Sequence, residues 1–138
     1  MAASIEFGQK IKELRMAKKH VDPRFTLRGF AEMVGISPAL LCRVEGGEFS
    51  IGVEKIKIIA QLLEADADEL LALAKRVDPD LNDCIFQRPK AMALFLRTAS
   101  GLSEDAMERL NEYAKLEAKM QADKESKAQN GGGDGNRQ

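Results

Sequence analysis

Apolar residues recur every three or four positions along most of the chain, in short stretches separated by residues typical of turns. This spacing places apolar side chains on one face of a helix, because an α-helix completes a turn about every 3.6 residues. The pattern predicts helices over residues 4–19, 26–34, 38–45, 53–64, 66–74, 89–99 and from 103 to about 120. Residues 81–86 are expected to add one or two further helical turns.

The apolar face of the first predicted helix consists of Phe7, Ile11, Leu14 and Ala17. Its lysines lie mostly off that face and are expected in solvent. The dipeptide Asp22-Pro23 then ends the helical pattern, because a proline disfavours helical backbone at the residue before it.

The turn chemistry of residues 26–47 predicts a helix-turn-helix. The hydroxyl of Thr26 can cap the first helix by accepting a hydrogen bond from an amide of its first turn. Gly35 stands where the end of that helix needs left-handed backbone. Ser37-Pro38 then restarts a helix, with Ser as the cap and Pro at the first helical position, where no amide proton is needed. Gly46-Gly47 ends the second helix.

Five short helices before residue 78 indicate a compact all-α domain over residues 4–77. The Asp78-Pro79 dipeptide marks its boundary. A helical extension is predicted over residues 78–122. Residues 123–138 are polar and end in NGGGDGNRQ, so they are predicted to form a disordered tail.

Charge is unevenly distributed along the 138 residues, although the net charge is only −1. Residues 1–57 hold ten Lys and Arg against seven Asp and Glu, whereas residues 58–138 hold eleven against fifteen. The basic part is suited to face phosphate groups, and the acidic part is expected to face elsewhere.

The chain has two cysteines and one histidine, which is too few for most nucleophilic or metal sites. The sequence therefore predicts no catalytic residues, no metal and no cofactor. Cys84 is expected to be a buried apolar residue, and His20 a surface or capping residue. No signal sequence and no apolar run of membrane length is present, so the cytoplasm is the expected location, at the nucleoid when DNA is bound.

Three stretches, FGQKIKELR, TLRGFAEMVGISPALLCRVEGGE and KIKIIAQLLEADADELLALA, together resemble the phage-repressor-like (Cro/repressor, Xre-type) helix-turn-helix regulators. The resemblance covers about half of the chain, from Phe7 to about Ala74. The residues at matching spacings are Ala31, Gly35, Ile36, Ser37, Leu41, Glu45 and Gly47. It implies a five-helix, lambda-repressor-like domain that binds double-stranded DNA and most often represses transcription as a dimer.

In a helix-turn-helix the second helix, here 38–45, enters the major groove. Leu41 and Val44 are expected to face the core, which leaves as base-facing candidates Ser37, Pro38, Ala39, Cys42 and Arg43. Arg43 is the one long donor among them, and it can pair with guanine or hold a phosphate. Cys42 is either a small neutral residue or a thiol whose oxidation switches binding off.

Phosphate contacts are predicted near the N-termini of the second and fourth helices. The candidates are Thr26, Arg28, Ser50, Lys55 and Lys57. Each lysine taken alone is also consistent with a solvated surface charge. Leu27 stands where the family commonly has Gln, and Pro38 and Ala39 where it often has polar residues. Direct base readout is therefore expected to be modest and DNA shape to contribute.

The resemblance also implies a buried ion pair between Arg15 and Glu45 that joins the first helix to the recognition helix. The apolar stripes of residues 89–120 can complete the core of a monomer or pair with a second copy, and a homodimer through these residues is predicted. The alternative function is an antitoxin-like or accessory module whose main partner is another protein and whose DNA binding is secondary.

Overall fold

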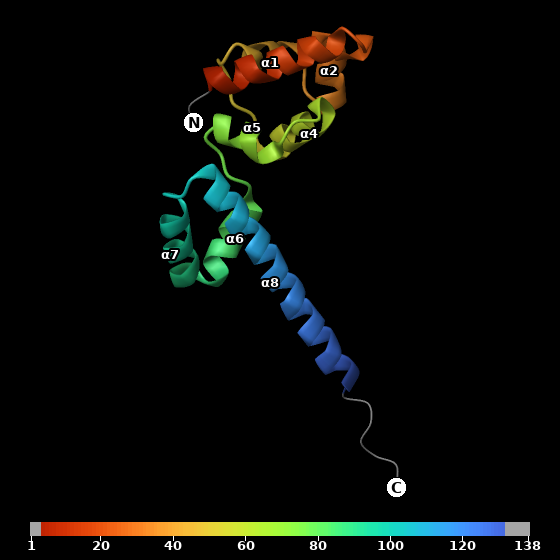
Figure 1. Ribbon diagram of the computed structural model, residues 1–138. Coiled ribbons are helices and arrows are strands. Elements are labelled where there is room, and N and C mark those ends of the chain that lie inside the picture. The colour runs from red at the N-terminus through yellow and green to blue at the C-terminus, as the bar shows by residue number, and fades with distance from the viewer. Residues whose placement is uncertain (1–3, 132–138) are drawn as a thin grey trace. The chain divides into compact units, whose positions relative to one another are not determined.

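The structure, a computed structural model, describes residues 4–131, which contain helices and no strand (Figure 1). The elements are α1 (Ile5–Lys19), the 3-10 helix η1 (Pro23–Phe25), α2 (Leu27–Val34), α3 (Pro38–Glu45), α4 (Val53–Leu63), α5 (Ala67–Leu73), α6 (Pro79–Gln87), α7 (Pro89–Ala99) and α8 (Glu104–Asn130). The prediction of an all-α fold is confirmed. None of these helices is both long and apolar enough to cross a membrane.

The chain divides into two compact units, Met1–Gln87 and Arg88–Gln138. The sequence predicted a boundary at residue 78, before α6, whereas α6 belongs to the first unit.

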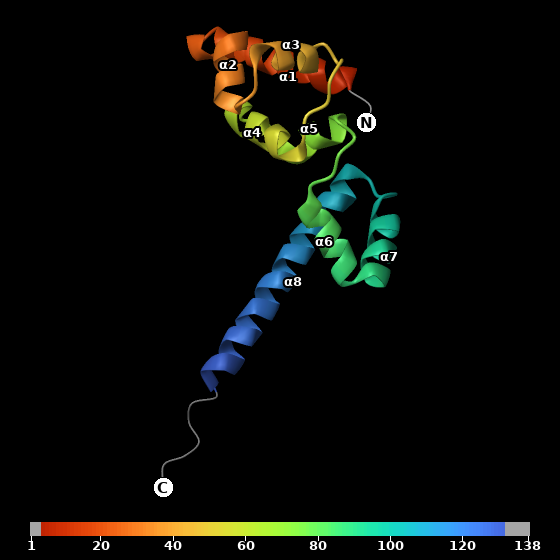
Figure 2. The ribbon, with the colours of Figure 1, turned by 180° about the vertical axis from the view of Figure 1, so that it is seen from behind.

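The core of the first unit is formed by the five helices α1 to α5. In Figure 2, α1 and α3 lie together across from α4 and α5, and α2 stands at one side. The side chains buried almost completely are Ile11, Phe30, Val34, Leu41, Val44, Ile56, Ile59, Leu70 and Leu71. Full burial of such a side chain stabilises the fold by roughly 1.5–3 kcal/mol. These contacts therefore fix how the short helices are placed.

Four helix ends in the first unit share one hydrogen-bond pattern. After the last helical turn one residue adopts left-handed backbone, and the next amide donates back to a carbonyl five residues earlier. The left-handed residues are Gly35, Gly47, Glu64 and Lys75. The returning bonds are Ile36 N to Ala31 O, Glu48 N to Arg43 O, Ala65 N to Ala60 O and Arg76 N to Leu71 O, all between 2.8 and 3.0 Å. Each helix therefore ends in a fixed direction.

Two predictions of burial are wrong. Ala17 is exposed, and its expected place on the inner face of α1 is taken by Arg15 and the half-buried Lys18. At about 100° per residue, position 18 lies only about 20° from Phe7 around the helix, whereas position 17 lies about 80° away. Cys84 is also exposed, because the half-buried side chain of α6 is its neighbour Ile85.

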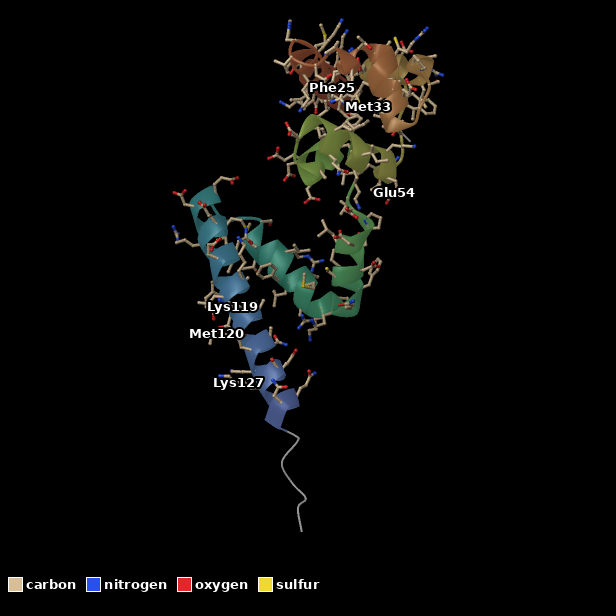
Figure 3. The ribbon with its side chains drawn as sticks, turned by 90° about the vertical axis from the view of Figure 1, so that its right-hand side faces the viewer. Phe25, Met33, Glu54, Lys119, Met120 and Lys127 are labelled. Carbon is tan, nitrogen blue, oxygen red and sulfur yellow. The ribbon has the colours of Figure 1, made fainter. Side chains whose placement is uncertain are left out.

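The second unit contains α7 and α8. Ser103 caps α8 by accepting from the amide of Ala106 at 3.2 Å. Ala99 is buried, and the half-buried residues are Met92, Ala93, Ala106, Met107 and Leu110. The exposed side chains on the second half of α8 include Lys119, Met120 and Lys127, which project outward in Figure 3.

The prediction of a disordered tail from residue 123 is wrong for residues 123–130, which continue α8. Ala, Lys, Glu and Gln make up most of this stretch and are good helix formers. Gln121 also donates to Glu125 at 3.1 Å, one helical turn away. Polarity there indicated exposure, not loss of helix. Residues 132–138 lie outside the described residues.

Candidate nucleic-acid interface

Residues 26–45 form the helix-turn-helix, and short-range hydrogen bonds fix its geometry. Thr26 Oγ1 accepts from the amide of Gly29 at 3.1 Å and so caps α2. Gly35 ends α2 with φ +85°, a left-handed conformation that favours glycine. Ser37 Oγ accepts from the amide of Leu40 at 3.1 Å, with Pro38 at the first position of α3. The predicted caps and turn are therefore all present.

The inner and outer faces of α3 differ sharply in burial. Leu41 and Val44 are completely buried. The five residues predicted to face DNA bases are all exposed: Ser37, Pro38, Ala39, Cys42 and Arg43. The structure thus brings them together on one surface, where Arg43 is the long hydrogen-bond donor.

Arg43 has two neighbours that the sequence analysis missed. Its guanidinium carbon lies 5.3 Å from the centroid of the Phe49 ring. Its Nε lies 4.0 Å from Oε2 of Glu48. Both neighbours follow the left-handed turn at Gly47, which directs the chain back past the end of α3. The succession of two glycines, an acid and an aromatic residue was the available signal.

Besides Thr26, which caps α2, three of the five predicted phosphate ligands have protein partners. The Nζ of Lys55 lies 3.2 Å from the carbonyl oxygen of Val34 and 3.4 Å from that of Gly35, so it caps the C-terminus of α2. Arg76 donates to Ser50 Oγ at 3.5 Å. Lys57 forms an ion pair with Asp78 at 3.1 Å.

The other two predicted phosphate ligands lie at the N-terminus of α2. Thr26 is the helix cap, and Arg28 is exposed in the first turn. Arg28 also borders a surface hollow of about 420 Å³, together with Glu32, Ile36 and Pro38. A cation at this edge of the helix-turn-helix is well placed for an anion, because the free amides of the helix N-terminus carry partial positive charge.

The Lys57–Asp78 ion pair changes the titration of both groups. The hydrogen bond and charge of Asp78 raise the pKa of Lys57. The hydrogen bond from Lys57, followed by the backbone amide of Asp80, lowers the pKa of Asp78. Lys57 is therefore charged at neutral pH and is held by the residue that precedes α6.

Arg15 and Glu45 form the ion pair that the resemblance implies. Arg15 Nε lies 2.8 Å from Glu45 Oε2, and Nη2 lies 2.9 Å from Oε1. The third nitrogen, Nη1, donates to the carbonyl of Phe25 at 3.1 Å. The two side chains are only 8% and 5% exposed. One guanidinium group therefore joins α1, η1 and the last turn of α3.

Gly8 allows α1 to lie directly on that same last turn. A Cβ atom at this position would collide with the carbonyl oxygen of Val44 and lie 2.7 Å from that of Glu45. Only glycine therefore permits the observed distance between the two helices.

The described residues contain no group of three side chains that could hold a metal ion. His20 is exposed at the end of α1.

The fold and this surface define an all-α protein built around a helix-turn-helix. No protein-family model and no curated protein matches the chain. Among solved structures, the chain is similar to the restriction-modification controller protein C.AhdI from Aeromonas hydrophila, with 27% sequence identity and a TM-score of 0.41. The match covers 48% of this chain and 88% of that protein.

Proposed function

We propose that the protein is a sequence-specific regulator of transcription that binds double-stranded DNA. The observation that carries the proposal is the helix-turn-helix, whose inner face is buried in the core while the outer face of α3 is exposed. The major groove of B-DNA is about 12 Å wide and admits one helix. The N-terminal part of α3, with its cap Ser37, is the part that meets base edges in such motifs.

In this proposal, the protein reads the DNA sequence through only a few direct contacts to bases. Arg43 supplies the charged donor, while Pro38 and Ala39 offer apolar contact to groups such as the thymine methyl. A good bidentate arginine–guanine pair discriminates by about 1–3 kcal/mol. DNA shape and flexibility supply further discrimination. Repression follows if the site overlaps a promoter, in line with the family that the sequence resembles.

Arg28 and the capped N-terminus of α2 are the phosphate contacts best supported by the structure, since Arg28 is exposed beside free helix amides. Lys55 would have to bind a phosphate while its Nζ stays beside the carbonyl oxygens of Val34 and Gly35. Lys57 must first leave Asp78. Ser50 remains a candidate through its hydroxyl.

The decisive experiment is selection of bound fragments from the source genome, followed by binding titrations at several salt concentrations. Affinity for a selected site should fall steeply with salt, with a log–log slope near −0.9 per neutralised phosphate. Arg43→Gln should lower affinity for that site, whereas Lys127→Gln, which removes an exposed charge near the end of α8, should not. The proposal fails if no fragment is retained even at low salt.

We propose further that the protein acts as a homodimer through residues 89–120. The second unit leaves Leu94, Phe95, Leu96, Tyr113 and Leu116 between 43% and 67% exposed. It also has an apolar hollow of about 290 Å³, lined by Phe95, Thr98, Ala99, Leu102 and Leu110. A second copy can cover such a surface, and a twofold dimer doubles the DNA contacts on a palindromic site.

Sedimentation of the full chain tests the dimer. Phe95→Glu places a charge at the hollow and should shift the protein to the mass of a monomer. Lys127→Glu introduces the same side chain on α8 beyond residue 120 and should leave the dimer intact. A wild-type chain that is monomeric at micromolar concentration excludes the homodimer. The same apolar residues would then favour the second candidate, an antitoxin-like or accessory module that binds another protein.

A further inference from the structure

We infer that Glu48 and Phe49 are positioning residues that hold Arg43 ready to contact a base and keep it from serving as a phosphate ligand. The inference rests on the proposed function and concerns the same surface. It identifies which of the two possible roles of Arg43 the geometry favours.

The backbone at the end of α3 brings these three residues together. Gly47 has φ +75°, and its amide donates to the carbonyl of Val44 at 3.0 Å. The amide of Glu48 donates to the carbonyl of Arg43 at 2.9 Å. In this type of helix end, the amide after the left-handed residue donates to the carbonyl five positions earlier. At the end of α2 these residues are Ile36 and Ala31; here they are Glu48 and Arg43. The turn therefore places Glu48, and Phe49 after it, beside Arg43.

Phe49 supplies a flat surface for the arginine. Phe49 is 42% exposed, and the centroid of its ring lies 5.3 Å from the guanidinium carbon. A guanidinium group is attracted to the face of an aromatic ring and stacks on it. The arginine side chain still has 58% of its surface exposed, so its hydrogen-bond donors remain accessible. Phe49 therefore restricts the side chain without covering the atoms that would read DNA.

Glu48 determines which DNA group Arg43 can bind. Its carboxylate oxygen lies 4.0 Å from Arg43 Nε, which is longer than a good charge-assisted hydrogen bond of about 2.7–2.9 Å. The arginine donors are thus not consumed, but a negative charge stays beside them. A phosphate entering this place would be repelled by the carboxylate, whereas the neutral edge of guanine offers O6 and N7 as acceptors. The arrangement selects a base over the DNA backbone.

The test compares the full chain with single variants on a selected site and on unrelated DNA. Arg43→Gln should weaken specific binding about 10- to 100-fold while leaving the salt slope unchanged, because no phosphate contact is lost. Phe49→Leu should lower specific binding several-fold without changing binding to unrelated DNA. Phe49→Tyr, which keeps an aromatic ring, should bind the specific site like the wild type. Glu48→Gln should strengthen binding to unrelated DNA and make the salt slope steeper by about one phosphate.

A measurement without DNA separates this inference from the proposed function. The Nε–Hε signal of Arg43 in the NMR spectrum of the free protein should show a ring-current shift that Phe49→Leu removes and Phe49→Tyr keeps. An unshifted signal in the wild type overturns the inference, even if the protein binds DNA. A salt slope that becomes shallower in Arg43→Gln also overturns it, because Arg43 would then hold a phosphate. If the NMR shift is present but the protein retains no DNA fragment, the base-reading role of Arg43 and the proposed function are both overturned. The stacking of Arg43 on Phe49 is then still established.

Discussion

Replacing Arg15 with alanine should lower the stability of the first unit far more than the loss of a surface charge does. The change removes a bidentate partner from Glu45, whose side chain is only 5% exposed, and a donor from the Phe25 carbonyl. It also removes the ion pair between α1 and the last turn of α3. The carboxylate of Glu45 would then be buried without a counter-ion.

Breaking a buried ion pair from one side typically costs about 3–5 kcal/mol. A domain of this size has a total stability of about 5–15 kcal/mol. For a chain of 60–100 residues, each kcal/mol lowers the melting temperature by roughly 4–8 °C. Arg15→Ala should therefore lower the melting temperature of the first unit by at least about 12 °C and weaken DNA binding as a consequence.

Urea denaturation followed by circular dichroism measures the loss, because the chain has no Trp and its one Tyr, Tyr113, lies in α8. Tyrosine fluorescence would report on the second unit only. Exchange of the α3 and α4 amide protons then assigns the transition to the first unit.

Arg24→Ala is the matched control, since it breaks an ion pair of 2.7 Å in which the arginine side chain is 76% exposed. Exposed pairs contribute little to stability, so this variant should unfold almost like the wild type. Arg15→Met combined with Glu45→Leu should recover part of the loss, because it leaves no unpaired buried charge. The reasoning is refuted if Arg15→Ala and Arg24→Ala unfold at the same urea concentration, or if DNA binding is lost while the melting temperature is unchanged.

Three further predictions concern the first unit. Gly8→Ala should cost about 1–3 kcal/mol in thermal melts, because its Cβ collides with α3, whereas Gly52→Ala enters open space and should change little. Lys75→Gly should raise stability by about 0.5–1 kcal/mol in the same melts, since it relieves left-handed backbone at φ +57° and glycine's greater freedom when unfolded offsets only part of that gain. Asp78→Asn should lower the melting temperature at pH 7. The difference from wild type should shrink as pH falls below about 4, because the lowered pKa of Asp78 stabilises the fold only above its unfolded value and this contribution disappears through its folded value. A difference that persists unchanged at pH 2–3 contradicts this.

The helix-turn-helix was predictable because its determinants act within a single turn of chain. Thr26 and Ser37 each cap the helix that follows them, and Gly35 adopts the left-handed backbone at its own position. None of these effects requires knowledge of distant contacts. The exposed face of α3 followed from the same helical period that buries Leu41 and Val44.

The neighbours of each site residue were not predictable in the same way. Lys55 reaches the carbonyls of α2 across 21 residues of sequence, and Lys57 pairs with Asp78 across the same number. Phe49 lies under Arg43 only because Gly47 directs the chain back along α3. Such contacts depend on how several helix ends are oriented, which spacing along the sequence does not encode.

At Gly8 no side chain separates α1 from the last turn of α3, because this residue lies against the carbonyls of Val44 and Glu45. Two backbones in such contact leave no flexible layer between them that could absorb a displacement. The first and third helices should consequently behave as one cooperative unit, whose amide protons exchange together in a shared opening. If α3 lies in the major groove, as proposed, a tilt of α3 there would therefore be transmitted directly to α1.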